Sequence, residues 1–182
     1  LEQALRRLGI GGTAAGTGLN SHPRYRDEVV KNLSRLTGFQ LRPAENLQEM
    51  TQSTISYAEV SGALKLLALE LIRIANDLRL LSSGPRTGFG EIALPTVQPG
   101  SSIMPGKVNP VMCETMMQVA ARVMGNDQTI GMCGAAGGQF QLNIMMPVMG
   151  DTALESARLL AGATKAFVDL CLSDMEANAE AC

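Results

Sequence analysis

The segment VSGALKLLALELIRIANDLRLL, residues 60–81, decides the fold. Its apolar side chains alternate in steps of four and three residues, the heptad spacing of a helix that packs in a bundle, at Val60, Leu64, Leu67, Leu71, Ile74, Leu78 and Leu81. Leu66, Leu69 and Ile72 add apolar surface on other faces of the same helix. Because such a helix must be covered by more than one neighbour, the segment predicts a long buried helix in an all-α protein.

The rest of the chain extends this pattern to further helices. We expect helices over residues 23–36, 45–81, 110–130 and 139–172, the last of them kinked at Pro147. Residues 82–109 form a loop long enough to suggest a functional role. The long helices are apolar on several sides, and 182 residues cannot cover all of that surface. We therefore expect partner helices from other chains.

Composition and charge exclude several classes of protein. Hydrophobic residues make up 46% of the chain and aromatic residues only 3%, a mixture that favours helix over sheet. The net charge of −2 and the lack of a basic run argue against nucleic-acid binding. Five charged residues, Lys65, Glu70, Arg73, Asp77 and Arg79, interrupt the apolar segment 60–81, which argues against a membrane span.

The cysteines and the N-terminal residues suggest a cytoplasmic protein without a metal. The four cysteines are scattered, with no CxxC spacing and no neighbouring histidine, so we expect reduced thiols and no metal site, at Cys113, Cys133, Cys171 and Cys182. No apolar stretch typical of a signal peptide follows residues 1–9.

The stretch GSSIMPGKVNP, residues 100–110, carries the chemistry. Five residues separate Gly100 from Gly106, and a valine follows Lys107, so the spacing excludes a nucleotide-binding P-loop. Lys107 and Asn109 suit the binding of a carboxylate, and Pro110 at a helix start directs a helix dipole toward the same site.

A serine beside such a carboxylate site, Ser101 or Ser102, is a candidate base. Positive potential from the loop would stabilise its alkoxide, which could remove a proton from the carbon next to the carboxylate. The dianion formed in this way needs preorganised hydrogen-bond donors. By its composition alone, the stretch of residues 100–110 could equally be a surface loop with ordinary turn glycines.

The same stretch resembles the signature of the fumarase/aspartase superfamily. Further segments are also similar to it, namely residues 11–14, 18–20, 83–86, 125–127 and 142–143. The resemblance implies an all-α, long-helix bundle that contributes to the helical core of a homotetramer, with each active site assembled from three subunits. It also implies a lyase without a cofactor, acting on a small dicarboxylate such as malate, fumarate or aspartate.

The resemblance assigns roles to individual residues. Ser101 is similar to the catalytic base, Lys107 and Asn109 to ligands of the substrate carboxylate, and Ser102 is placed with the substrate-binding residues. Glu114 matches an acid that pairs with an active-site histidine in the fumarase branch. Without the resemblance, we would expect Glu114 to be an exposed acid of the kind that the helix dipole favours in the first turn of a helix.

Two departures from the family pattern limit what this chain does alone. It lacks the family's active-site Thr-His and Ser-Ser-Asn segments, and its single histidine, His22, lies elsewhere and is expected to cap a helix or face solvent. We expect residues 1–175 to form the C-terminal part of the central helical domain and residues 176–182 to begin a truncated C-terminal domain. Such a central fragment is not expected to be active by itself.

The branch of the superfamily is decided by few residues. Residues 11–13, 20–23 and Cys113-Glu114 resemble fumarases, whereas residues 51–52, 80–83 and Gln141 resemble aspartases. We favour a fumarate hydratase because Cys113-Glu114 lies closest to the chemistry. An aspartate ammonia-lyase and a non-catalytic helical assembly module are the alternatives.

Overall fold

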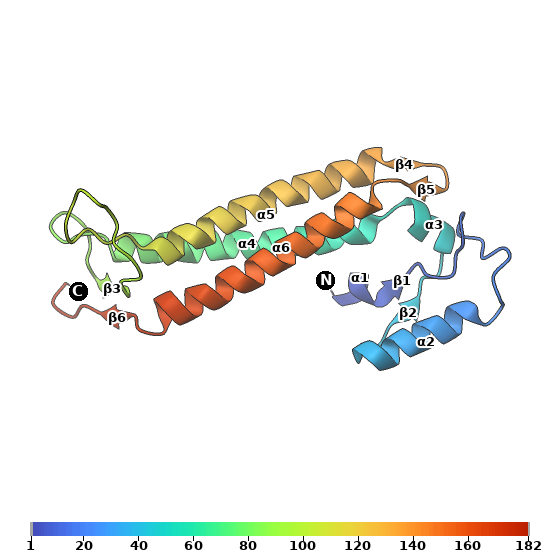
Figure 1. The fold of residues 1–182 in the computed structure, drawn as a ribbon, viewed down its shortest axis with the longest axis horizontal. Helices are drawn as coiled ribbons and strands as arrows, with labels where there is room; N and C mark the ends of the chain where they lie inside the picture. Colours follow the sequence, from blue (N-terminus) through green and yellow to red (C-terminus); the bar gives the residue numbers. More distant parts are fainter. Residues whose placement is uncertain (1, 182) are drawn as a thin grey trace. The chain divides into compact units, whose positions relative to one another are not determined.

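The computed structural model describes residues 2–181, and long helices dominate it (Figure 1). Helix α4 spans Ile55–Leu81, α5 spans Val111–Ala136, and α6 spans Met146–Phe167, followed by a π-helical turn, η1, at Val168–Leu172. The expected all-α class is confirmed. The chain forms two compact units, one of residues up to 63 with 126–155, the other of residues 64–125 with those from 156 onward.

Within residues 2–181, the first unit also contains three short helices and four short strands. Its helices are α1 (Glu2–Arg6), α2 (Tyr25–Thr37) and α3 (Leu47–Gln52). Strand β1 (Arg7–Leu8) pairs in parallel with β2 (Arg42–Pro43), and β4 (Gly138–Gln139) pairs antiparallel with β5 (Leu142–Asn143). These strands have two residues each, so they fasten loops and do not form a sheet layer.

Helix α2 agrees closely with the expectation for residues 23–36. It ends at Gly38, whose left-handed backbone (φ 74°) suits glycine and lets its N–H bond to the carbonyl oxygen of Ser34. The exposed His22 precedes the helix and accepts the backbone N–H of Arg24 at Nδ1, over 3.2 Å. The N-cap of α2 is Arg24, which has no side-chain cap bond, so His22 does not cap the helix and instead faces solvent, the other role expected of it.

The single helix expected over residues 45–81 is wrong, because Thr54 interrupts it. Helix α3 is capped by the side chain of Asn46, which accepts the N–H of Glu49, and α4 begins only at Ile55. Thr54 is buried and has a left-handed backbone (φ 50°), which is strained for a β-branched residue. Its hydroxyl accepts a hydrogen bond from Nδ2 of Asn143, so a distant contact holds the break in place.

The expected helix over residues 139–172 is also wrong at its start. Helix α5 continues to Ala136, the β4–β5 hairpin follows, and α6 begins at Met146. Pro147 therefore lies in the first turn, where its missing N–H costs nothing and no kink is needed. The buried Asn143 ends the hairpin, since its Oδ1 accepts the N–H of Met145 at 2.8 Å and its Nδ2 also reaches the carbonyl oxygen of Cys133.

The core of the second unit lies where α4, α5 and α6 meet (Figure 1). Small and sulfur-containing side chains allow the helices to approach closely, and the buried cluster consists of Ala75, Cys113, Met116, Ala163, Phe167 and Cys171. Leu71 and Leu78, two positions of the predicted heptad, pack against it. The heptad prediction for residues 60–81 is therefore only partly correct, because Leu67 and Ile74, two other heptad positions, are 50% and 37% exposed.

Two thiols meet inside this core. Sγ of Cys113 lies 3.9 Å from Sγ of Cys171, and both cysteines are free. Burial, with a smaller contribution from Cys171, raises the pKa of Cys113 from 9.0 to about 12. Burial likewise raises the pKa of Cys171. Both thiols are therefore protonated at neutral pH.

We predict that Asn143→Ala lowers the free energy of unfolding of the full-length protein by about 1–3 kcal/mol, because it leaves buried partners on Thr54, Cys133 and Met145 unsatisfied. Urea denaturation followed by circular dichroism measures the change. The control is Gln141→Ala, an exposed position of the same hairpin. Equal midpoints for the two variants would contradict the role of Asn143.

We also predict that Cys113 and Cys171 resist alkylation in the folded protein. Iodoacetamide reacts with the thiolate, and a pKa of about 12 leaves only about one Cys113 thiol in 10⁴ ionised at pH 8. Mass spectrometry should find both cysteines unmodified in the native state and modified after denaturation in guanidinium. Rapid native-state labelling at Cys113 would show that the core is open there.

Candidate active site

The connection between α4 and α5 is a chain of short closed loops within the second unit. The first follows α4 directly, where Ser83 accepts the N–H of Phe89 at Oγ (3.1 Å) and the N–H of Gly90 at its carbonyl oxygen (2.7 Å). Gly88 packs so closely that an added Cβ would lie 2.2 Å from the carbonyl carbon of Ser83. Residues 83–90 are therefore closed at their base by main-chain contacts.

The next part of the connection is fastened to the end of the chain. Strand β3 (Ile92–Ala93) pairs antiparallel with β6 (Glu176–Ala177). Asn178 strengthens the attachment, since its backbone N–H donates to the carbonyl oxygen of Glu91 and its side chain donates to that of Gly90. These bonds limit the movement of the connection before it reaches residue 100.

The signature stretch is itself a closed loop. Gly100 donates its N–H to the carbonyl oxygen of Lys107 over 2.7 Å, beside a bridge between Pro99 and Val108. An added Cβ at Gly100 would lie 2.9 Å from the Lys107 oxygen and 3.0 Å from Oδ1 of Asn109, so only glycine fits. The base of the loop thereby sets the position of Asn109 next to the main chain.

Ser101 lies just inside this closure and is half-buried. Its Oγ accepts the backbone N–H groups of Ile103 and Met104, each over 3.2 Å. Two amide donors stabilise negative charge on that oxygen, which is what a serine base requires. The same two contacts also form a common serine turn. They are therefore compatible with a catalytic loop and with an ordinary surface loop.

The other loop residues are open to solvent. Ser102 and Lys107 are exposed, and within residues 2–181 Lys107 has no carboxylate at ion-pair distance. Two apolar side chains of the loop, Ile103 and Met104, are also exposed, Ile103 at 86%. The tip of the loop therefore has a free cation and an uncovered apolar surface.

A pocket of about 650 Å³ lies where the last turn of α4 meets the first turn of α5. Its lining includes Asn109 and Glu114, two of the five predicted site residues. The other three, Ser101, Ser102 and Lys107, lie on the adjacent loop and do not line it. The structure thus brings the predicted amide and acid together.

Sequence reasoning missed the wall of the pocket that α4 provides. Asn76 and Arg79 line it from the end of the helix, and Ser82 and Ser83 continue it. Asn76 and Arg79 are three residues apart and so share a helix face, a signal that was present in the sequence. Arg79 was considered only as a charge that interrupts an apolar segment.

Cys113 and Glu114 are neighbours in sequence but have different surroundings. Cys113 is fully buried in the core with Cys171, whereas Glu114 is half-buried and lines the pocket. Consecutive residues of a helix point about 100° apart, which explains the difference. The Cys113 thiol, on which the choice of branch rested, therefore does not line the pocket.

The residues described here offer no set of metal ligands. Within residues 2–181, no group of three or more His, Cys, Asp or Glu side chains is arranged to hold a metal ion. Over the same residues, no helix has the length and apolar character needed to cross a membrane.

The comparisons with known proteins agree with this fold and with the signature loop. The sequence model of the family described as lyase matches residues 1–125. The chain belongs to this lyase family, and its relatives place it in the fumarase/aspartase superfamily.

Curated relatives of two activities match almost equally well. The chain is 49% identical to the aspartate ammonia-lyase of Bacillus subtilis over 176 residues, 97% of this chain and 37% of the relative. It is 50% identical to the class II fumarate hydratase of Corynebacterium glutamicum over 182 residues, 98% of this chain and 38% of the relative. The chain thus spans less than two fifths of the length of these relatives.

Two solved structures superpose on this chain over nearly its whole length. A fumarate lyase/delta crystallin from Brucella melitensis superposes with a TM-score of 0.92 at 47% identity, covering 100% of this chain and 39% of that one. A class II fumarase from Schistosoma mansoni superposes with a TM-score of 0.95 at 36% identity, covering 99% of this chain and 41% of that one.

We predict that Gly100→Ala opens the signature loop, because the added methyl group collides with the Lys107 oxygen and with Asn109. Trypsin should then cleave the full-length protein after Lys107 several-fold faster than it cleaves the unmodified protein. The control is Gly106→Asn, since Gly106 has open space around it and asparagine accepts its left-handed φ of 79°. Equal cleavage rates for both variants would refute the steric argument.

Proposed function

We propose that the full-length protein is a fumarate hydratase, a lyase that removes water from malate to give fumarate by anti elimination. The observation that carries the proposal is the pair of backbone donors on Ser101 Oγ, in a loop that adjoins the pocket of Asn109 and Glu114. Membership of the lyase family supports it.

Each loop residue has a role in this reaction. Lys107 and Asn109 bind one substrate carboxylate, with Ser102 beside them. Ser101, as the alkoxide, takes the proton from the carbon next to a carboxylate, and the electron pair of that C–H bond forms the double bond. The C–O bond breaks as the hydroxyl oxygen receives a proton from a general acid, the histidine considered next, and leaves as water. The donors on Ser101 Oγ stabilise its charge before the proton is transferred.

Glu114 is proposed to pair with the histidine that assists the leaving group. The single histidine of this chain, His22, precedes α2 and does not line the pocket of Glu114, so it does not fit this role. The complete site would therefore need residues from outside this chain. The boundary expected at residue 176, where a further domain would begin, also stays a prediction.

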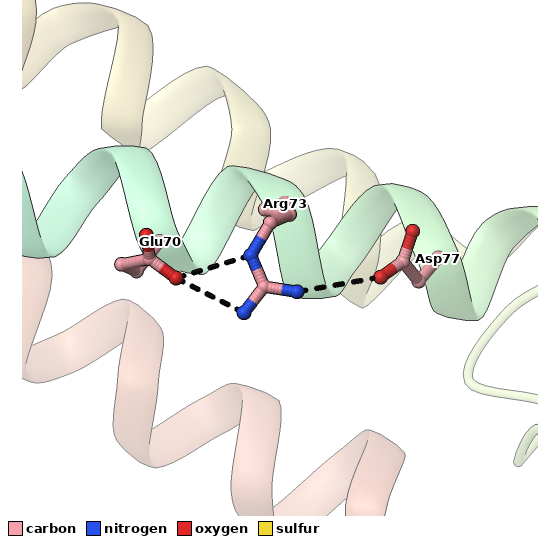
Figure 2. Close-up of polar contacts among 3 residues, drawn as sticks. All are labelled: Glu70, Arg73 and Asp77. Atoms are coloured by element: carbon pink, nitrogen blue, oxygen red, sulfur yellow. Dashed lines mark hydrogen bonds and ion pairs between the residues drawn. The ribbon is translucent and has the colours of Figure 1, made fainter.

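We also propose that the protein assembles as a homotetramer through its long helices. Large apolar side chains are exposed along α4, at Leu66, Leu67, Leu69, Ile74 and Leu80. The exposed charges among them already pair within the helix (Figure 2): Nε and Nη2 of Arg73 lie 3.1 and 3.0 Å from Oε2 of Glu70, and its Nη1 lies 3.6 Å from Asp77. The apolar positions would be covered by other copies of the chain. A location in the cytoplasm stays a prediction.

An aspartate ammonia-lyase, which would release ammonia and give fumarate from aspartate, is the second candidate. Residues 51–52 and Gln141 favour it, as does the 49% identity to an enzyme of that name. The buried position of Cys113 also weakens the sequence argument for the hydratase, because a residue outside the pocket lining does not touch the leaving group.

We predict that Ser101→Ala lowers turnover of the full-length protein by about 10²–10⁴-fold, because it removes the base while leaving the helices intact. The absorbance of fumarate, with malate or aspartate as substrate, measures the rate, and gel filtration measures assembly. Ser173→Ala, an exposed hydroxyl at the end of η1, is the control.

Three results would change the proposal. Near-normal turnover by the Ser101→Ala variant would exclude this serine as the base. Consumption of aspartate without malate turnover would assign the ammonia-lyase reaction. An assembled protein that acts on neither substrate would be a helical assembly module.

A further inference from the structure

Arg79 occupies an unusual position at the end of α4. It is half-buried, and its Nη1 lies 3.5 Å from Oδ1 of Asn76 and 3.4 Å from Sδ of Met117. Both acceptors are neutral, the distance to the Asn76 oxygen is long, and thioether sulfur is a weak acceptor. The guanidinium group therefore keeps most of its hydrogen-bonding capacity unused.

Arg73, six residues earlier on the same helix, has the carboxylate partners that Arg79 lacks among the described residues. Arg73 lies between two carboxylates, those of Glu70 and Asp77, although all three side chains are largely exposed (Figure 2). Arg79 is more buried, yet it has no carboxylate at ion-pair distance within residues 2–181. A partly desolvated cation gains most from an anionic partner, so Arg79 is suited to a ligand that supplies one.

The pocket around Arg79 has the size and the polar groups for such a ligand. Its volume of about 650 Å³ lies within the range of small-molecule sites, and the amides of Asn76 and Asn109 line it together with Arg79. Glu114 is the acid of the same lining, and its charge would repel a dicarboxylate if Arg79 were absent. Lys107 lies on the adjoining loop and is not part of this lining, in which Arg79 is the basic side chain.

We propose that Arg79 binds one carboxylate of a four-carbon dicarboxylate in the pocket between α4 and α5. This inference rests on the proposed function, because it assumes the same class of substrate. Asn109, which lines the pocket, and Lys107, on the adjoining loop, then hold one end of the substrate at the edge of the pocket, while Arg79 holds the other end inside it. With a charged contact at each end, the site selects dicarboxylates over compounds that have a single carboxylate.

The test measures binding and does not depend on turnover. Isothermal titration of the full-length protein gives the dissociation constants of succinate and of succinamate, in which an amide replaces one carboxylate. In the unmodified protein, succinate should bind about tenfold or more tightly than succinamate. In Arg79→Gln this preference should fall close to one, and Arg79→Lys should restore part of it.

A merely structural role for Arg79 would weaken both ligands equally and leave the preference unchanged, which would overturn the proposal. Arg35→Gln is the matched control, because Arg35 is an exposed arginine in the last turn of α2. No succinate binding by the unmodified protein would also overturn the proposal. A protein that turns over neither malate nor aspartate refutes the proposed function, while the succinate preference still decides the role of Arg79.

A second measurement covers the case in which Arg79→Gln does not fold. Phenylglyoxal modifies accessible arginines, and mass spectrometry can follow Arg79 in the unmodified protein. Succinate should slow modification of Arg79 several-fold and succinamate should protect it less. Equal rates with and without succinate, or no modification of Arg79 at all, would exclude a ligand in contact with this side chain.

Discussion

The packing of α4 against α5 and α6 is the constraint on which the candidate site depends. The fully buried Ala75 and Cys113 let α4 and α5 approach closely, and Phe167 of α6 packs in the same cluster. This contact fixes the end of α4 and the start of α5, the two ends of the loop connection. The walls of the pocket, with Arg79 on α4 and Glu114 on α5, are therefore set by core packing.

Main-chain bonds then shape the loop that the two helices support. The bond from Gly100 to the Lys107 oxygen closes the signature stretch, and the donors of Ile103 and Met104 fix Ser101 Oγ. Glycine is required at position 100 because an added Cβ would lie 2.9 Å from the Lys107 carbonyl oxygen and 3.0 Å from Oδ1 of Asn109. A loop held in this way can leave Lys107 free for a ligand while its base stays in place.

Cys113 supports the candidate site from the core but does not line the pocket. This thiol belongs to the core that holds α5, whereas its neighbour Glu114 lines the pocket. Residues that distinguish the hydratase and ammonia-lyase branches can therefore differ for reasons of packing. Recognition of the leaving group must depend on groups that face the substrate.

The sequence by itself determined the all-α class, the packed positions Leu71 and Leu78 of α4 and the extent of α2, because helix periodicity and helix-end signals act between near neighbours. The signature loop was found through its resemblance to the superfamily. Only the tertiary structure decided the break at Thr54, the hairpin at residues 138–143 and the entry of Arg79 into the pocket. Each depends on contacts between distant parts of the chain, such as the bond from Asn143 to Thr54, 89 residues apart. Local patterns do not encode such contacts, since they form only when the helices pack.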